Sequence, residues 1–403
     1  MTPTCKTWIY LYNEIVSIQN TGITTYKKGV TMNSITYVGM DVHTSNYTFC
    51  CYTVKNDEAF AFATAEANYK SVLKYLNQIR KQLGETRFIC GYEAGSLGYS
   101  LQRELSARGV ECIILAPSTM PKAPGQRVKT DKRDAENIAR CLAYHQYKAV
   151  YVPDEEDDAV KEYIRMRNDV KVQLKSVKQQ IIAFCTRHGL FYDGKSYWTQ
   201  KHLKWVKTLE FSNSLYKETL NEYLALYFAL TEKIAVFDAR IEELSQTERY
   251  QEKVSSLVCL SGIGINIAMS LISEVGDFNR FASAQKFSAY LGLVPGEHSS
   301  GNSINRTSIT KAGNSHLRRL LIEAAQCYSR GAIGKKSRLL IAKQEGAPRE
   351  IVNYADKANE RLKRKFYRIA LRSKHNIAKV AVARELACFI WGMMTGHTDC
   401  LIC

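Results

Sequence analysis

The sequence predicts a mixed α/β domain over residues 32–152, a coiled-coil helical linker over 153–250 and a mostly helical C-terminal domain over 251–403. Three observations support this division. Short β-branched and aromatic runs alternate with helical segments in the first region, an unbroken heptad pattern runs through the second, and basic helices follow a glycine- and serine-rich stretch in the third. A chain of 403 residues has room for two or three domains.

The first 31 residues show no strong periodicity, whereas Met32 begins a segment, MNSITYVGMDVH, that is typical of a strand start. We therefore expect residues 1–31 to be an N-terminal extension upstream of the first domain. Activity retained by a chain that starts at Met32 would support this interpretation, and insolubility of that chain would count against it.

The first domain is expected to contain a sheet with flanking helices. Residues 35–54 are β-branched and aromatic on both sides of a short polar turn, which predicts a β-hairpin. A helix is expected over 67–83. The apolar runs at 87–95 and 111–117 predict two more strands, and the helical pattern of 98–109 separates them.

The linker is expected to begin after Pro153 with a long helix whose acidic first turn suits the helix dipole. A second helix carries an a/d heptad pattern on Leu220, Tyr223, Tyr227, Leu230, Ile234, Phe237, Ile241 and Leu244. The first helix carries a looser seam on Tyr163, Met166, Val170, Leu174, Val177, Ile181 and Phe184. The two helices either pair as an antiparallel hairpin across a loop near Gly194 or form an intermolecular coiled coil.

The composition favours a nucleic-acid partner. With 56 Lys and Arg against 39 Asp and Glu, the formal charge is +17 and the pI is about 9.2. The chain contains no run of 18 apolar residues and no clear signal peptide, so we expect a cytosolic protein without a membrane partner. The twelve scattered cysteines indicate reduced core thiols, and His397, Cys400 and Cys403 are a weak zinc motif near the C-terminus.

Four carboxylates are candidates for a metal site. Asp41 lies within the first hairpin strand, Glu93 lies at the carboxyl end of another strand, and Asp131 and Asp134 lie three residues apart at the start of a helix. Phosphodiester chemistry uses such clusters because Mg²⁺ ions bound to carboxylates stabilise the entering and leaving oxygens. The alternative is that these are helix caps and surface charges, although an unpaired aspartate inside an apolar strand is costly.

A glycine- and serine-rich stretch over 299–315 combines hydroxyl groups with basic residues, which are groups that hold phosphates. The alternative is a solvated loop. A helix is expected to follow with Asn314 or Ser315 as its cap. Upstream, LSGIGINIA (260–268) resembles the glycine turn of a helix-hairpin-helix, whose backbone amides contact phosphate.

Six segments, VGMDVH, YEAG, KTDKRDAENIARCL, LSGIG, LGLVPGEHSSG and ITKAGNSHLRRLLIEAA, together resemble the insertion-sequence transposases of the family numbered one hundred and ten. Their order and spacing are most similar to its Coxiella-type subgroup, and the Piv DNA invertases are relatives. The resemblance covers about residues 35–335. It implies a RuvC-like domain with a ribonuclease-H fold, a coiled-coil linker and a C-terminal transposase domain, in a bacterial or archaeal cell and associated with the nucleoid.

The resemblance also implies the site and its chemistry. The family's acidic tetrad falls on Asp41, Glu93, Asp131 and Asp134 as Mg²⁺ ligands, and its nucleophilic serine falls on Ser300, with Ser299 as the alternative because this chain has a serine doublet. The serine of the family attacks a DNA phosphodiester and forms a covalent phosphoserine intermediate. Some members are guided by a noncoding RNA, and members assemble as dimers and tetramers in which the tetrad of one subunit meets the serine of another. The expected nucleic-acid contacts are Lys129, Arg133, Arg306, Lys311, Asn314, Arg318 and Arg319.

Two other functions are compatible with the residues. A junction nuclease would use the same carboxylates with water as the nucleophile, and Ser300→Ala distinguishes the two enzymes because only the recombinase needs the serine. A non-catalytic nucleic-acid-binding scaffold would depend on charge and the coiled coil alone. The basic tail after residue 335 is expected to contact nucleic acid in each case.

Overall fold

The computed structural model describes residues 35–121, 130–297 and 305–398. Several predictions fall outside these residues: the N-terminal extension, Lys129, the serine pair Ser299 and Ser300, and the zinc motif ending in Cys400 and Cys403. Contacts between residues divide the chain after Val152 into an N-terminal unit and a helical unit, which are described separately.

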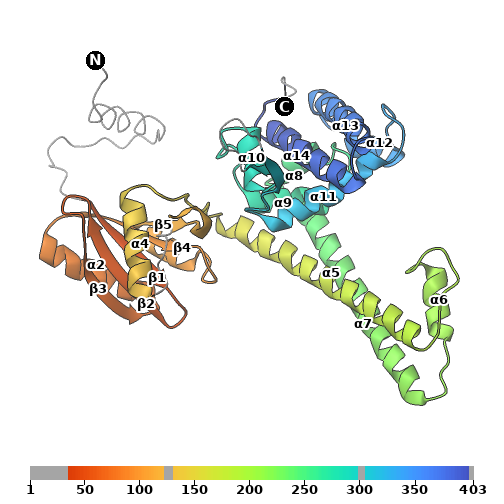
Figure 1. Cartoon of the computed structure of the whole chain (residues 1–403), viewed down its shortest axis with the longest axis horizontal. Helices are drawn as coiled ribbons and strands as arrows, with labels where there is room; N and C mark the ends of the chain where they lie inside the picture. The colour runs from red at the N-terminus through yellow and green to blue at the C-terminus, as the bar shows by residue number, and fades with distance from the viewer. Residues whose placement is uncertain (1–34, 122–129, 298–304, 399–403) are drawn as a thin grey trace. The chain divides into compact units, whose positions relative to one another are not determined.

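The N-terminal unit is built on a five-stranded mixed sheet (Figure 1). Its strands are β1 (Ile35–Val42), β2 (Asn46–Thr53), β3 (Glu58–Glu66), β4 (Arg87–Glu93) and β5 (Glu111–Leu115), in the order β3-β2-β1-β4-β5. Strands β1, β2 and β3 are antiparallel neighbours, while β4 runs parallel to β1 and β5 runs parallel to β4. The predicted hairpin and the two later strands are confirmed. Strand β3 was not predicted, because the alanines of EAFAFATAE have low strand propensity.

Helices cover both faces of this sheet. Helices α2 (Tyr69–Leu83) and α3 (Ser100–Ser106) pack on one face, where they meet side chains such as Val38 and Met40 of β1. Helix α4 (Asp131–Ala143) packs on the other face, together with Tyr37. The alternation of side chains along β1 therefore assigns Tyr37 and Asp41 to the α4 side. A short 3₁₀ turn, η1 (Pro117–Thr119), follows β5.

A helical arm opens the second unit, with α5 (Glu155–Arg187), α6 (Gln200–Thr208) and α7 (Ser214–Ser245). Helices α5 and α7 pair antiparallel within the chain: Tyr163 packs on Phe237, and Arg167 forms a bidentate ion pair with Asp238 at 2.8 and 3.1 Å. Of the two pairings that the sequence left open, the structure shows the antiparallel hairpin within the chain. The α5 seam was wrong at one position, because Met166 is 48% exposed.

Short elements and two long helices complete the helical unit. They are α8 (Gln251–Leu257), α9 (Ile265–Val275), α10 (Ala284–Tyr290), β6 (Pro295–Glu297), β7 (Arg306–Ile309), α11 (Ser315–Ala324), η2 (Ala325–Ser329), α12 (Arg338–Gln344), α13 (Arg349–Ala370) and α14 (His375–Met394). Helix α14 is buried along most of its length and packs against α10, α11 and α13. The same core includes Val160 and Ile164 of α5 and Ile241 of α7, so the base of the arm is part of it.

The described cysteines form no disulfide, and all of them except Cys327 are buried, as expected for reduced core thiols. Across the described ranges, no helix has the length and apolar character needed to cross a membrane.

Candidate active site

Two glycines on neighbouring strands allow α4 to lie very close to the sheet. A Cβ added at Gly39 on β1 would lie 1.9 Å from the carbonyl oxygen of Ala135, and one added at Gly91 on β4 would lie 3.0 Å from Leu142 Cδ1. Both of these neighbours belong to α4. Because a side chain at Gly39 would overlap the helix backbone, this close approach requires glycine.

Asp41 and Glu93 lie at the ends of β1 and β4, on the face that α4 covers. The two strands are parallel and Met40 pairs with Tyr92, so Asp41 and Glu93 are the next residues along each strand. Each lies two positions beyond one of the glycines that face α4, and side chains two apart share a face. Burial, followed by the charge of Glu93, raises the pKa of Cys141 on α4. Glu93 therefore lies near α4, at the strand end where the sequence placed it.

Asp131 and Asp134 occupy the first turn of α4, where the sequence predicted a helix start. The helix is capped by Thr130, whose hydroxyl accepts the Arg133 N–H at 3.4 Å. The two aspartates lie on the same side of the helix, and the helix dipole stabilises their negative charge. The cap hydrogen bond is supplied by Thr130, so neither aspartate is needed for that bond.

Asp41, His43 and Asp131 form a group of potential metal ligands among the described residues. One ligand atom from each lies within 4.8 Å of the others. His43 Nε2 is 3.3 Å from Asp41 Oδ2 and 4.0 Å from Asp131 Oδ1. Asp134 is close enough for its charge to raise the pKa of Asp41. The structure thus brings three of the four predicted carboxylates together. The fourth, Glu93, lies at the end of the neighbouring strand β4 and on the same face of the sheet.

The surroundings of Asp41 disfavour the negative charge of its carboxylate. Burial raises its pKa, His43 lowers it, and Asp134 and Asp131 raise it further. Its Oδ2 atom is buried and accepts no well-aligned hydrogen bond from the described part of the chain, although His43 Nε2 is nearby. A buried carboxylate oxygen without a partner is unfavourable. A divalent cation would supply that partner and offset the repulsion between the aspartates, so the donor set fits such an ion.

His43 is the residue that the sequence analysis did not include in the site. The signal was present in VGMDVH, because residues two apart in an extended strand share a face. A lone exposed histidine beside a strand is common, so that spacing alone did not distinguish it. Its proximity to Asp131 depends on the packing of α4 on β1, which the local sequence does not reveal.

The basic residues expected to contact nucleic acid differ in their exposure and in the contacts they make within the chain. Arg133 and Lys311 are exposed. Arg318 donates to the carbonyl oxygens of Leu291 and Ala312, at 3.0 Å each, and thus holds the loop before α11. Arg319 pairs with a glutamate one turn along the exposed face of α11. The side chain of Arg306 lies outside the described residues, although its backbone is part of β7.

Asn314 has both polar ends engaged within the helical unit. Its Oδ1 accepts the Leu317 N–H at 3.0 Å and caps α11, so Asn314 is the cap of the two candidates predicted from the sequence, and its Nδ2 donates to Glu274 at 2.9 Å. Glu274 is buried and receives a bidentate ion pair from Arg165 at 2.7 and 3.0 Å. Burial raises the pKa of Glu274, but Arg165 and Asn314 together hold it below its usual value. This network ties the start of α11 to α9 and α5.

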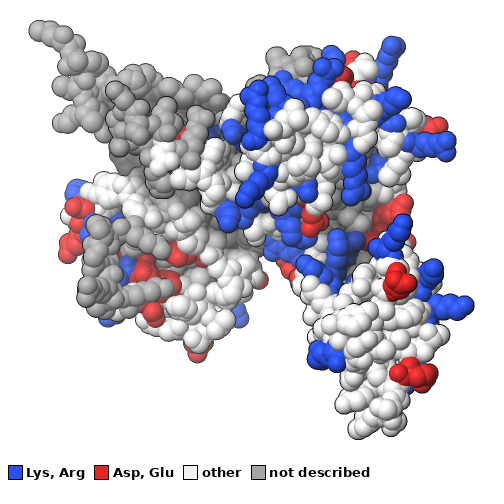
Figure 2. Space-filling view, turned by 45° about the vertical axis from the view of Figure 1, so that its right-hand side comes forward, with Lys and Arg blue, Asp and Glu red and all other residues white. Residues whose placement is uncertain are grey.

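Lysine and arginine side chains crowd the face of the helical unit drawn in Figure 2, and acidic side chains gather on the face of the N-terminal unit. The two units therefore present different charges: the N-terminal unit carries the acidic group, and the helical unit carries a surface suited to polyanions.

Sequence comparisons identify the class of protein. A family model described as "Transposase", of the DEDD type in IS110 elements, matches residues 38–188, and the model described as "Transposase IS116/IS110/IS902 family" matches residues 255–338. The first match contains the four acidic residues, and the second contains the serine pair. A carboxylate group in a chain with these matches defines a DNA-cleaving and recombining enzyme.

The chain belongs to the IS116/IS110/IS902 family of insertion-sequence transposases. It is 35% identical over 360 residues to the transposase-designated protein y4qE of Sinorhizobium fredii, covering 89% of this chain and 88% of the relative. It is 32% identical over 337 residues to the transposase of element IS1533 from Leptospira borgpetersenii, covering 82% of this chain and 95% of the relative. It is 27% identical over 295 residues to the transposase of IS1111A from Coxiella burnetii, covering 73% of this chain and 74% of the relative. The expected family is confirmed.

Proposed function

We propose that this transposase excises and integrates its element by Mg²⁺-assisted attack of Ser300 on DNA phosphodiesters, through a covalent phosphoserine intermediate. The observation that carries the proposal is the group formed by Asp41, His43 and Asp131 at the sheet edge, with Asp134 beside it. The five-stranded mixed sheet with carboxylates at two strand ends supports a RuvC-like, ribonuclease-H-type fold for residues 32–152.

In this proposal the tetrad of Asp41, Glu93, Asp131 and Asp134 would hold Mg²⁺. The oxygen-rich donor set suits that ion, and His43 would adjoin it. When bound, Mg²⁺ supplies positive charge that stabilises the developing negative charge on phosphate oxygens. The chain's own contribution is to fix the carboxylates before DNA arrives: Gly39 allows α4 to approach, and Thr130 caps the turn that carries the aspartates.

The covalent step conserves the number of phosphodiester bonds. A bond forms between Ser300 Oγ and phosphorus as the bond from phosphorus to a deoxyribose oxygen breaks, and the serine proton balances the charge on the departing oxygen. A deoxyribose hydroxyl of the partner strand then attacks the phosphoserine in reverse, which frees Ser300. Because a serine hydroxyl is a weak nucleophile, the step needs an activating group.

Cleavage of a DNA that carries the joined element ends tests the acidic site. We expect Mg²⁺-dependent cleavage by the wild type and a loss of at least about 10²-fold for Asp41→Asn and Asp131→Asn. Asp277→Asn is a matched control, because Asp277 lies in the loop after α9 of the helical unit. Wild-type rates for Asp41→Asn would remove the acidic group from the mechanism.

Ser300→Ala distinguishes the recombinase from the alternative, a junction nuclease that uses water at the same carboxylates. A recombinase loses both the covalent adduct and strand exchange in this variant. A nuclease continues to cleave DNA in the Ser300→Ala variant, and neither the wild type nor the variant forms an adduct. Ser299→Ala is tested in parallel: an adduct retained in this variant and lost in Ser300→Ala assigns the attack to Ser300, and the reverse assigns it to Ser299.

The proposal also includes a noncoding RNA that guides the transposase to its DNA. The net charge of +17 supports simultaneous binding of RNA and DNA. Sequencing of RNA that copurifies with the protein tests it: a single enriched species encoded at the element's end supports guidance. Full strand exchange by protein freed of RNA with ribonuclease would rule guidance out.

We further propose that the protein acts as a homodimer or homotetramer in the cytoplasm, associated with the nucleoid, with residues 153–250 as linker and 251–403 as transposase domain. Leu226 and Val236 of α7 and Val172 of α5 are 51–64% exposed after the arm has paired within the chain. Exposed apolar side chains on a long arm are suited to a second copy. Light scattering should show a smaller assembly for Leu226→Glu/Val236→Glu, and an unchanged mass would contradict this use of the arm.

A further inference from the structure

Strands β6 and β7 form a two-stranded hairpin whose connecting segment contains the serine pair. They pair antiparallel, with Pro295 opposite Ile309 and Glu297 opposite Arg306. Ser300 follows the last residue of β6 by three positions, so its placement depends on how the two strands leave the helical unit. The connecting segment lies outside the described residues, whereas the base of the hairpin is described on both sides.

Two glycines allow the two ends of the hairpin to lie directly against each other. Gly292, on the entering side, has a φ of +64°, and an added Cβ would lie 2.1 Å from the Ala312 carbonyl oxygen. Gly313, on the leaving side, has a φ of +70°, and an added Cβ would lie 1.9 Å from the Tyr290 carbonyl oxygen. Both glycines are in the left-handed region, which favours a residue without a side chain. The entering and leaving chains are therefore in backbone contact.

Backbone hydrogen bonds extend this contact toward the strands. The Thr310 N–H donates to the Val294 carbonyl oxygen at 2.9 Å, and the Lys311 N–H donates to the Gly292 carbonyl oxygen at 3.2 Å. Lys311 itself has a φ of +56°, which is unusual for a residue with a side chain. Because such a conformation is unfavourable by itself, the contacts around it must stabilise it.

Arg318 of α11 bridges the two ends of the hairpin. Its Nη1 donates to the Leu291 carbonyl oxygen on the entering side and to the Ala312 carbonyl oxygen on the leaving side, at 3.0 Å each. Leu291 directly follows α10, and the last carbonyl groups of a helix have no partner within the helix. A charged donor forms a stronger hydrogen bond than a neutral one. One side chain thus joins both ends of the hairpin to α11.

Helix α11 is itself anchored at its first turn. The side chain of Asn314 donates to the buried Glu274, which is held by Arg165. The Asn314 N–H donates to the Tyr290 carbonyl oxygen at 3.2 Å, and Leu317 is fully buried in the core. Arg318 therefore connects the hairpin to a helix whose position is fixed by α9 and α5.

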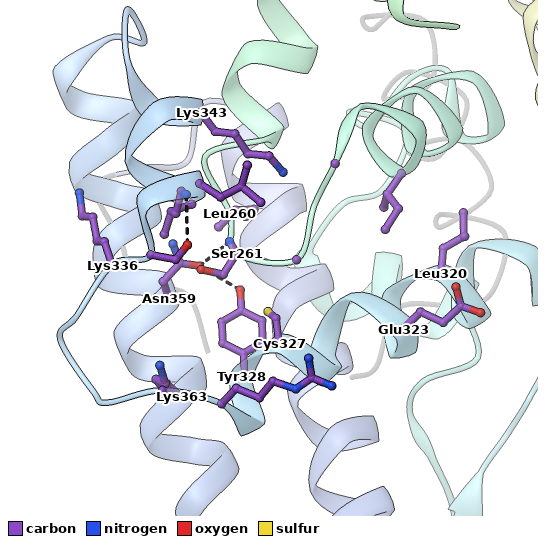
Figure 3. A pocket seen from close by; sticks show the side chains of 18 of the residues that line it. Leu260, Ser261, Leu320, Glu323, Cys327, Tyr328, Lys336, Lys343, Asn359 and Lys363 are labelled. Atoms are coloured by element: carbon purple, nitrogen blue, oxygen red, sulfur yellow. Dashed lines mark hydrogen bonds between the residues drawn. The ribbon is translucent and has the colours of Figure 1, made fainter. Parts of the chain in front are cut away.

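The guanidinium of Arg318 is directed at the hairpin and not at the large cavity of the helical unit. Figure 3 shows that cavity, to which α11 contributes Leu320 and Glu323. Among the described residues that line it, Arg318 is absent. The contacts of Arg318 thus favour a brace for the hairpin over the phosphate contact that the sequence predicts, and the two roles have different measurable effects.

We propose that Arg318 is a positioning residue for the covalent step. By bridging the carbonyl oxygens of Leu291 and Ala312, it fixes the base of the β6–β7 hairpin and so selects which serine of the pair attacks DNA. Arg318 acts through the backbone and needs no contact with DNA or with the reacting atoms. This inference rests on the serine mechanism of the proposed function.

The test compares the full-length wild type with Arg318→Gln, which removes the guanidinium. Lys286→Gln is the matched control, because Lys286 is exposed on α10, just before the hairpin, and its replacement removes the same charge. Three quantities are measured for DNA with joined element ends. They are the affinity over a salt series with a metal chelator, the rate of adduct formation at saturating DNA and Mg²⁺, and the serine that carries the nucleotide, located by mass spectrometry.

We expect Arg318→Gln to match the control in affinity and in the slope of log K against log salt, because no phosphate contact is lost. The rate at saturating DNA should fall by about tenfold or more, because the nucleophile is misplaced. The nucleotide, which wild type carries on one serine, should be shared between Ser299 and Ser300. A purely structural defect would lower the amount of active enzyme without moving the nucleotide.

Two results would overturn the proposal. A slope reduced by roughly 0.9, with the wild-type rate restored at saturating DNA, would make Arg318 a phosphate contact. A nucleotide confined to the same serine as in wild type would exclude the selection, whatever the rate. Arg318→Met, which keeps an apolar stem without a donor, replaces Arg318→Gln if the latter lacks a native circular dichroism spectrum.

Amide hydrogen exchange tests the brace without any reaction. The amides of Thr310 and Lys311, which bond to the entering chain, should exchange faster in Arg318→Gln than in Lys286→Gln, and equal exchange would overturn the proposal. A wild type that forms no adduct would contradict the proposed function. An adduct in wild type, together with an unchanged rate and serine in Arg318→Gln, would contradict this inference alone.

Discussion

Replacing Gly39 with alanine should disable the acidic site without touching any carboxylate. The added Cβ would lie 1.9 Å from the Ala135 carbonyl oxygen and 2.5 Å from the Ala139 nitrogen, both of which are backbone atoms of α4. Neither atom can rotate away, so α4 or β1 must shift. Because α4 carries Asp131 and Asp134, the shift separates them from Asp41.

The size of the displacement follows from the contact. Moving the Ala135 oxygen from 1.9 Å to beyond 3.0 Å requires about 1 Å of separation between helix and sheet. Overpacking of this kind costs about 1–3 kcal/mol of folding free energy. A misplacement of about 1 Å in a catalytic group lowers rates by about 10²-fold. We therefore expect Gly39→Ala to fold with reduced stability and to lose nearly all DNA cleavage.

The assay is single-turnover cleavage of a DNA with joined element ends over a series of Mg²⁺ concentrations, combined with urea unfolding. Gly95→Ala is the matched control, because its added Cβ comes no closer than 3.9 Å to another atom although Gly95 is only two residues from Glu93. A folded Gly39→Ala protein that cleaves at the wild-type rate would refute the reasoning that α4 positions the aspartates.

Three further predictions concern other residues. His43→Ala should raise the Mg²⁺ concentration for half-maximal cleavage by about tenfold or more, and an unchanged midpoint would exclude His43 from the site. Glu274→Gln should lower the free energy of unfolding in urea by about 1–3 kcal/mol, because it removes a buried ion-pair partner; the exposed Glu162→Gln, which faces the same arginine, should change it by less than about 0.5 kcal/mol. Burial among aromatic rings lowers the pKa of His202 below 6.5, so the unfolded chain takes up its proton first and stability should fall as pH drops below 6.5, by at most about 1.4 kcal/mol per pH unit. Thermal unfolding at pH 5.5 and 7.5 should show a smaller shift for His202→Leu than for wild type or His145→Gln, and equal shifts would contradict this origin.

The elements that the sequence predicted well are those whose pattern is local. The hairpin of β1 and β2, the helix that starts at Asp131 and the heptad helix α7 each depend on periodicity or capping within a few residues. The pairing of α5 with α7 remained undecided between two partners, because a heptad pattern describes an apolar seam and not the surface that covers it.

The features that the sequence could not predict depend on contacts between distant segments. Gly39 is required only because α4 returns to β1 nearly a hundred residues later, and His43 joins the site through the same packing. Strand β3 is stabilised by pairing with β2 and not by its alanines. His202 packs against the ring of Tyr192, ten residues earlier in the chain, and no periodic pattern in the sequence indicates this contact.

The most direct test of the central claim is to locate the bond between protein and DNA. Wild-type protein is incubated with Mg²⁺, copurified RNA and a DNA that carries the joined element ends, then denatured and digested, and the nucleotide-bearing peptide is sequenced by mass spectrometry. The account predicts a nucleotide on Ser300, lost in Ser300→Ala and retained in Ser299→Ala. DNA cleavage with no nucleotide on any serine, at an unchanged rate in Ser300→Ala, would contradict it and assign the carboxylates to a nuclease that uses water.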